Sequence, residues 1–249
     1  MSGHSKWSTI KRKKAANDAA RGKVFTKLNR EIVTAARAGG GDPDSNIRLR
    51  AAIDAARAAN MPSANIDKAV KRGTGEIEGV SYEEASFEGY GPGGVALFID
   101  VLTDNRNRTV AEIRHVLTKH GGSLGEGGCV AWMFALKGVI AIPRNGRSED
   151  DMLEIVLEAG AEDLATEDEI FQVTTAPASL AAVRTELQGK GVSIESAELV
   201  RVPQNTVKLE GKDAETMLRV MESLEDLDDV QRVSSNFDIP EELMRSLED

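Results

Sequence analysis

The residues that could carry out chemistry are few, and their spacing does not form a familiar active site. The single cysteine, Cys129, lies in an apolar run, which favours a buried core position over a reactive thiol. The acidic runs at 149–151 and 225–226 are typical of helix starts and solvated charge. None of the three histidines has metal-ligand spacing to another histidine or to the cysteine: His4, His115 and His120. The sequence therefore predicts a protein that is not an enzyme and uses no metal or cofactor.

The chemistry most strongly indicated is phosphate binding by the first thirty residues. They contain nine Lys or Arg and one acid, Asp18, although the whole protein has a formal net charge of −10. Because clustered like charges repel one another, such a segment needs a polyanionic partner. We expect this segment to contact nucleic acid, with binding that weakens steeply as salt rises. Its cations are Lys6, Lys11, Arg12, Lys13, Lys14, Arg21, Lys23, Lys27 and Arg30.

Five further residues complete the candidate nucleic-acid contacts. Arg106 and Arg108 come just before a predicted helix, whose first N–H groups and dipole favour anions. A solvated loop in which Asn107 or Thr109 caps the helix is the alternative. The other three candidates are Trp7 in the basic arm and the pair Lys71 and Arg72 in a short helix. None of these residues has the spacing of a helix-turn-helix reader, a zinc finger or a bZIP region, so no base sequence is indicated.

Charge and composition restrict the partners and the compartment. Residues 1–75 contain 16 Lys or Arg and 6 Asp or Glu, a net charge of +10, whereas residues 76–249 have a net charge of −20. The acidic part would orient a polyanion toward the basic part, or it is simply a solvated surface. One cysteine permits no intrachain disulfide, and the longest apolar run, Cys129–Leu136, is too short to span a bilayer. We expect a cytoplasmic protein with no membrane partner.

The first 78 residues read as a basic helical domain. A mobile arm up to about residue 14 precedes a helix over 15–38, in which Val24, Leu28 and Ile32 recur at helical spacing. Asp42-Pro43 reads as the cap and first residue of a second helix that runs to about residue 59 and buries Ile47. A third helix, capped by Ser63, stops at Gly73. Short connections between three helices predict a small bundle.

From about residue 81 the pattern changes to an α+β fold of two further domains. Strands at 85–90 and 95–102, a helix at 109–120 and a strand at 129–135 form an incomplete first module. The next segment has the order β-α-β-β-α-β of a ferredoxin-like domain. The elements missing from the first module follow at 206–209, 214–224 and 230–237. We therefore expect an inserted ferredoxin-like domain, with boundaries at 1–78, 79–136 plus 204–249, and 137–203.

Several motifs in this sequence resemble those of the YebC/PmpR family, and the likeness covers essentially the full length. The basic arm carries Gly3-His4-Ser5-Lys6-Trp7 and the Lys11–Lys14 cluster with Ala15-Ala16. The remaining motifs are Gly22-Lys23-Val24-Phe25-Thr26-Lys27-Leu28, Asn60-Met61-Pro62, Lys71-Arg72-Gly73-Thr74-Gly75, Tyr90-Gly91-Pro92-Gly93-Gly94 and Thr103-Asp104-Asn105-Arg106-Asn107-Arg108.

The resemblance implies a helical domain followed by two α/β domains, with no catalytic residues. It also implies a cytoplasmic, DNA-binding regulator of transcription. Relatives that include a mitochondrial translational activator imply an alternative, a factor that binds the ribosome and its RNA and relieves stalls at proline-rich stretches. A homodimer could place two basic bundles along one duplex, but nothing in the sequence requires one. The sequence leaves DNA and ribosomal RNA open, because both present phosphates.

Overall fold

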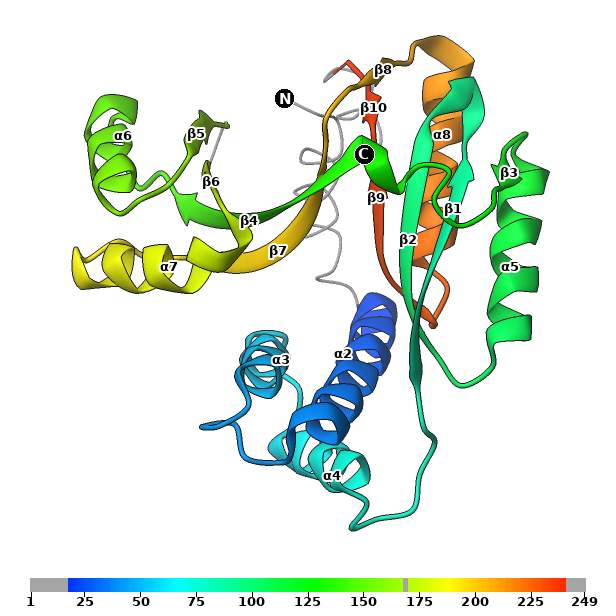
Figure 1. The fold of residues 1–249 in the computed structure, drawn as a ribbon, viewed down its shortest axis with the longest axis horizontal. Helices are drawn as coiled ribbons and strands as arrows, with labels where there is room; N and C mark the ends of the chain where they lie inside the picture. The colour runs from blue at the N-terminus through cyan, green and yellow to red at the C-terminus, as the bar shows by residue number, and fades with distance from the viewer. Residues whose placement is uncertain (1–17, 168–169, 241–249) are drawn as a thin grey trace. The chain divides into compact units, whose positions relative to one another are not determined.

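The computed structural model describes residues 18–167 and 170–240, and it describes side chains from Gly22 onward. Three N-terminal helices precede two regions that each contain a sheet, which confirms the α+β fold class (Figure 1). Two compact units are formed. One spans Met133–Gln204, and the other combines the chain up to Trp132 with the chain from Asn205 onward. In the described ranges no helix is both long and apolar enough to cross a membrane.

The three helices form a bundle with a core of mainly small side chains. They are α2 (Asp18–Gly39), α3 (Ile47–Ala58) and α4 (Ser63–Thr74). Apolar residues at three- and four-residue spacing place one stripe of each helix inside. Close packing of small side chains brings the helices near one another and leaves the basic residues on the other faces. The buried core contains Ile32, Val33, Ala35, Ala36, Leu49, Ala52, Ile53, Ala56, Met61, Ile66 and Ala69.

Helix α3 begins later than the sequence predicted. Asp42 does not cap it but closes a turn, accepting a hydrogen bond from the Asp44 N–H at 2.9 Å. The cap is the buried Asn46, whose side chain accepts from the Leu49 N–H at 3.0 Å and donates to the Ala35 carbonyl at 2.8 Å. Because the helix starts at Ile47, that side chain points to solvent and is 77% exposed. The expectation that Ile47 is buried was wrong.

The end of α4 also differs from the prediction, because Gly73 does not stop the helix. It lies inside α4 and is buried where the helix meets α2. A Cβ at this position would lie 2.5 Å from the Ala36 Cβ and 2.6 Å from the Val33 carbonyl oxygen. The helix ends at Gly75, whose φ of 83° is the left-handed conformation that glycine adopts without strain. Gly73 is therefore required for close packing of α4 on α2.

The α/β part of the first unit is one four-stranded sheet with two helices on one face. Its order is β3-β1-β2-β9, with β1 (Glu83–Tyr90), β2 (Ala96–Thr103), β3 (Ser123–Leu124) and β9 (Val230–Ser235). Helices α5 (Arg106–Lys119) and α8 (Gly211–Glu225) share a core with Leu97, Ile99 and Val101 of β2. The C-terminal β9 pairs with β2, so the sheet is completed from the far end of the chain. A short parallel pair joins β8 (Val207–Lys208) to β10 (Phe237–Asp238).

The strand predicted over 129–135 does not form as expected. A 3-10 turn occupies Ala131–Met133, and the strand β4 starts only at Phe134. The reason is the buried carboxylate of Glu88, which accepts from the N–H groups of Gly128, Val130 and Ala131 at 2.7–2.8 Å. Those N–H groups are consequently not available for a sheet ladder. Cys129 is half-buried in this loop rather than in a strand core.

The second unit has the predicted ferredoxin-like order. Its elements are β4 (Phe134–Pro143), α6 (Glu149–Glu158), β5 (Asp163–Thr166), β6 (Ile170–Thr175), α7 (Leu180–Gly189) and β7 (Ser196–Pro203). The antiparallel sheet has the order β5-β6-β4-β7. The two ends of the unit meet, because the Gln204 N–H donates to the Met133 carbonyl at 2.9 Å. This adjacency is what an inserted domain needs.

Candidate nucleic-acid interface

Three predicted phosphate-binding cations of α2 contact residues 225–229 of the same chain, two through carboxylates and one through a main-chain carbonyl. Lys23 pairs with Asp226 at 2.9 Å, and Lys27 Nζ donates to the Glu225 carbonyl at 2.6 Å. Arg30 binds the carboxylate of Asp229 and donates to the Leu102 carbonyl. Arg30, expected on a face open to solvent or phosphate, is therefore buried. The cations of α2 and the turn between α8 and β9 form one charged contact.

Asp229 is the centre of this contact. Its side chain is 2% exposed and accepts from Thr109 Oγ1 at 2.6 Å and from Thr103 Oγ1 at 3.1 Å. The guanidinium of Arg108 donates to both carboxylate oxygens at 2.8 and 3.0 Å, opposite Arg30. Burial alone raises the pKa of the Asp229 carboxyl, but the hydrogen bonds from Thr109 and the two arginines outweigh it and lower that pKa to about 2. Asp229 is thus a carboxylate at neutral pH.

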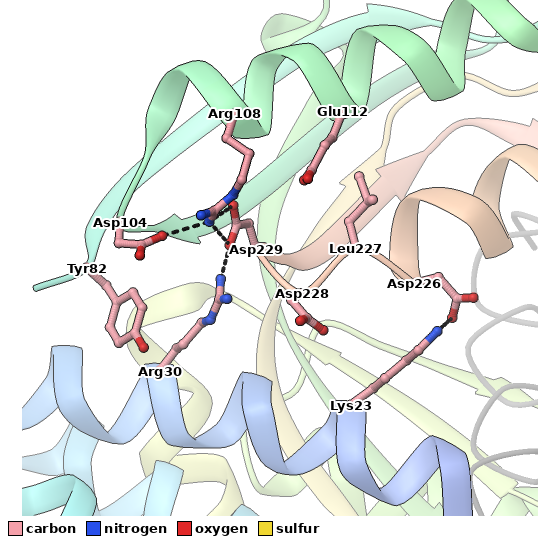
Figure 2. Close-up of a pocket in the computed structure, with 10 residues that line it drawn as sticks. All are labelled: Lys23, Arg30, Tyr82, Asp104, Arg108, Glu112, Asp226, Leu227, Asp228 and Asp229. Atoms are coloured by element: carbon pink, nitrogen blue, oxygen red, sulfur yellow. Dashed lines mark hydrogen bonds and ion pairs between the residues drawn. The ribbon is translucent and has the colours of Figure 1, made fainter. Parts of the chain in front are cut away.

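Figure 2 shows how the two arginines converge on this carboxylate. Arg30 rises from α2 and Arg108 descends from α5, and the Asp229 side chain lies between them. The Tyr82 ring flanks Arg30, with 5.2 Å between the guanidinium carbon and the ring centre. These groups line an open pocket at whose edge Lys23 reaches Asp226. The charges in this pocket are mostly paired with one another.

Arg106 and Arg108, which were predicted just before a helix, have different surroundings from those expected. Both lie in the first turn of α5, not before it, and the cap is Asn105, which accepts from the Arg108 N–H at 3.1 Å. Arg108 also donates to Asp104 at 2.7 Å, and hydrogen bonds to Asp229 and Asp104 raise its pKa. Arg106 is exposed and stacks over the Phe87 ring at 5.6 Å. Arg106 thus contacts an aromatic ring, whereas Arg108 contacts two carboxylates.

Helix α4 carries cations that are available to a ligand. Lys68 and Lys71 are exposed and Arg72 is half-exposed, and the side chain of none of the three has an ion pair or hydrogen bond to another described residue. Their spacing of three and four residues places them on one side of the helix. Sequence reasoning selected Lys71 and Arg72 but missed Lys68, although that same spacing could have identified it.

The remaining predicted contacts lie in or near the undescribed N-terminal segment. The backbone of Arg21 belongs to α2, but its side chain is not described. Six residues lie wholly outside the described ranges: Lys6, Trp7, Lys11, Arg12, Lys13 and Lys14. Their contribution to binding stays a prediction.

The candidate reactive groups do not form an activated arrangement in the described part of the chain. Burial and the nearby Glu88 carboxylate raise the pKa of the Cys129 thiol, whereas a nucleophilic cysteine needs a lowered one. Within residues 18–167 and 170–240, no group of three or more His, Cys, Asp or Glu could hold a metal ion.

Comparison with known proteins identifies relatives along the whole chain. A family model described as the TACO1/YebC protein N-terminal domain matches residues 5–76, and one described as the TACO1/YebC second and third domain matches 82–237. A probable transcriptional regulatory protein from Dictyoglomus turgidum is 56% identical, covering 99% of this chain and all of the relative. One of the same description from Pelotomaculum thermopropionicum is 57% identical over 96% of this chain and 99% of its own length. The crystal structure of a conserved hypothetical protein from Aquifex aeolicus matches with a TM-score of 0.84 and 48% identity, over 91% of this chain and 94% of the other.

Proposed function

Because this chain belongs to the TACO1/YebC family, we propose that it is a non-enzymatic regulator of gene expression that acts in the cytoplasm by binding nucleic acid. The observation that carries the proposal is the separation of charge along the chain. Residues 1–75 have a net charge of +10 on a protein whose net charge is −10. A polyanion is the partner that this separation favours.

DNA is the nucleic acid we propose. Relatives that share more than half of their residues with this chain over nearly its whole length are described as probable transcriptional regulatory proteins. Duplex DNA presents closely spaced phosphates that a basic surface can bind without reading bases. Ribosomal RNA has the same chemistry and serves as the comparison ligand in the test below.

The proposed contact combines the N-terminal arm with one side of the bundle. Helix α4 supplies Lys68, Lys71 and Arg72, and Arg106 adds a cation at the start of α5. The arm supplies Lys6, Trp7 and the cluster Lys11–Lys14. Arg30 and Arg108 were also predicted to bind phosphate, and in this structure both contact the Asp229 carboxylate.

The test is equilibrium binding of the full chain to a labelled 30-base-pair DNA, followed by fluorescence anisotropy. A variant with Lys68→Glu, Lys71→Glu and Arg72→Glu is expected to bind at least tenfold more weakly, because it loses phosphate contacts and adds repulsion. The Lys11–Lys14 cluster changed to Glu should have a similar effect. Circular dichroism checks that both variants stay folded.

The matched control changes three exposed cations of the α/β part, Lys208→Glu, Lys212→Glu and Arg219→Glu. This variant has the same net charge as the α4 variant, so it reports the effect of net charge alone. We expect its affinity for the DNA to fall by no more than about threefold. Equal losses of DNA affinity in the α4 variant and in the control would contradict the proposed contact. Tighter binding of ribosomal RNA than of DNA would replace the DNA assignment by the ribosomal alternative.

A further inference from the structure

Three cations of α2 lie on a single face, and carboxylate and carbonyl groups of the same chain already contact them. Lys23, Lys27 and Arg30 are separated by four and three residues, so they project from the same side of the helix. All three contact the turn between α8 and β9, residues 225–229. While this contact is made, these three side chains are engaged within the chain.

The composition of this turn is unusual for the end of a helix. A helix C-terminus has a partial negative charge and favours nearby cations. The last turn of α8 nevertheless contains no basic residue and carries Glu222 and Glu225, with Asp226 as the cap and Asp228 beyond it. Lys27 supplies the missing cation from α2, since its Nζ donates to the Glu225 carbonyl. The turn thus presents α2 with a run of negative charge of the kind that a phosphate backbone offers.

The contact has an inner and an outer part with different accessibility. In the inner pair the side chains of Arg30 and Asp229 are 11% and 2% exposed, and the carboxylate is fully hydrogen-bonded. In the outer pair the side chains of Lys23 and Asp226 are 45% and 59% exposed. Water and salt screen an exposed pair, so its partners exchange readily. A buried pair stays closed because opening it leaves an uncompensated charge.

We propose that residues 225–229 act as an internal competitor for nucleic acid, an autoinhibitory contact in which Asp226 occupies the phosphate-binding position on Lys23. Nucleic-acid phosphates displace Asp226 and open the outer pair, while Asp229 keeps the turn attached through Arg30. The inference rests on the proposed nucleic-acid function. It predicts that the free protein binds more weakly than its count of cations suggests.

The test measures binding of the full chain to the same 30-base-pair sequence as DNA and as RNA. Asp226→Asn removes the carboxylate that pairs with Lys23, and we expect binding about threefold tighter. Asp228→Asn is the matched control, because Asp228 is exposed, two residues away, and pairs with no described residue. Both variants have the same net charge and nearly the same position, so a long-range electrostatic effect would be equal in the two. The DNA and RNA arms identify which phosphate backbone competes.

Lys23→Gln is made in the wild type and in Asp226→Asn, and these variants complete a double-mutant cycle. Competition predicts that Lys23→Gln weakens binding less than twofold in the wild type and about threefold with Asp226→Asn, where Lys23 is free. Two results would contradict the inference while the wild type still binds and the proposed function stands. One is equal binding by Asp226→Asn and Asp228→Asn. The other is an equal effect of Lys23→Gln in the wild type and in Asp226→Asn. If neither wild type nor Asp226→Asn binds either duplex, both fail. Binding by Asp226→Asn alone would support both.

Discussion

At the scale of single residues, Asp229 is a buried carboxylate on which two arginines converge. It joins Arg30 of the bundle to Arg108 of α5 and to two threonines. A buried carboxylate is stable only when its oxygens are hydrogen-bonded and its charge is compensated, and here both conditions are met. Asp229 therefore stabilises the attachment of the helical bundle to the sheet.

Replacing this carboxylate should strongly destabilise the first unit. Asp229→Asn removes the charge but leaves the buried Arg30 guanidinium without its counter-ion, so we expect a loss of about 3 kcal/mol in the free energy of unfolding. Urea denaturation followed by circular dichroism measures it. The control is Asp228→Asn, which should change stability by less than about 0.5 kcal/mol. A similarly small change for Asp229→Asn would show that the contact is not stabilising.

The lowered pKa of Asp229 gives this contact a defined pH dependence. The folded-state pKa of about 2 lies below the ordinary value of about 3.9, so the carboxylate contributes stability above pH 4 that is lost as pH falls through 2. The shift corresponds to about 2.5 kcal/mol. The difference in unfolding free energy between wild type and Asp229→Asn should be constant from pH 7 to 5 and shrink between pH 4 and 2. A difference that stays constant down to pH 2 would contradict this assignment.

The role of Asp229 could not be predicted from the sequence. Its partner Arg30 is 199 positions away, and only the fold brings the two together. From the sequence, the neighbouring acids 225–226 were interpreted as solvated charge. Arg30 was predicted to bind phosphate because it lies in a helix with other cations that were given the same role. The cations Lys71 and Arg72, in contrast, lie on an accessible helix as expected, because local spacing alone decides which side of a helix a residue faces.

At the scale of elements, periodicity predicted the existence and type of the helices and strands better than it predicted their boundaries. The hairpin of β1 and β2 and the order of the second unit were confirmed, since alternating apolar residues and glycine-rich turns are local signals. The strand at 129–135 and the start of α3 were wrong because distant groups decide them. The Glu88 carboxylate binds the loop N–H groups, and the Asn46 amide reaches the end of α2.

Two glycines of the bundle should respond to alanine in opposite directions. Gly73→Ala places a Cβ 2.5 Å from the Ala36 Cβ, and we expect a loss of about 2 kcal/mol in unfolding free energy as α4 moves away from α2. Gly22→Ala, in α2, meets nothing within 4 Å and should stabilise the helix by about 0.5–1 kcal/mol. Thermal and urea denaturation of the two variants measure both values. Equal effects would show that helix packing does not require Gly73.

At the scale of the whole molecule, the chain forms two compact units, one of which is a continuous segment between the two parts of the other. Helices α5 and α8 share one core in the first unit, whereas α6 and α7 cover the sheet of the second (Figure 1). The domain boundaries at 78/79, 136/137 and 203/204 remain a prediction. Each unit has a hydrophobic core of its own, which is the requirement for independent folding.

Excision tests this organisation. Met133 and Gln204 are hydrogen-bonded at 2.9 Å, so replacing residues 134–203 by a short Gly-Ser linker should leave the first unit folded. Residues 133–204 alone should also fold. Circular dichroism and a cooperative thermal transition for each piece are the expected results. A shortened chain that is unfolded while residues 133–204 fold would mean that the first unit depends on the second.

The most direct test of the nucleic-acid proposal is the salt dependence of DNA binding by the full chain. Each neutralised phosphate contributes a slope of about −0.9 to log K against log salt concentration. With contacts from the arm and α4, we predict a slope of about −4 or steeper, reduced by about 1 for each cation of α4 that is replaced by alanine. A slope near zero, or one that no change in the basic segment alters, would contradict nucleic-acid binding by this segment.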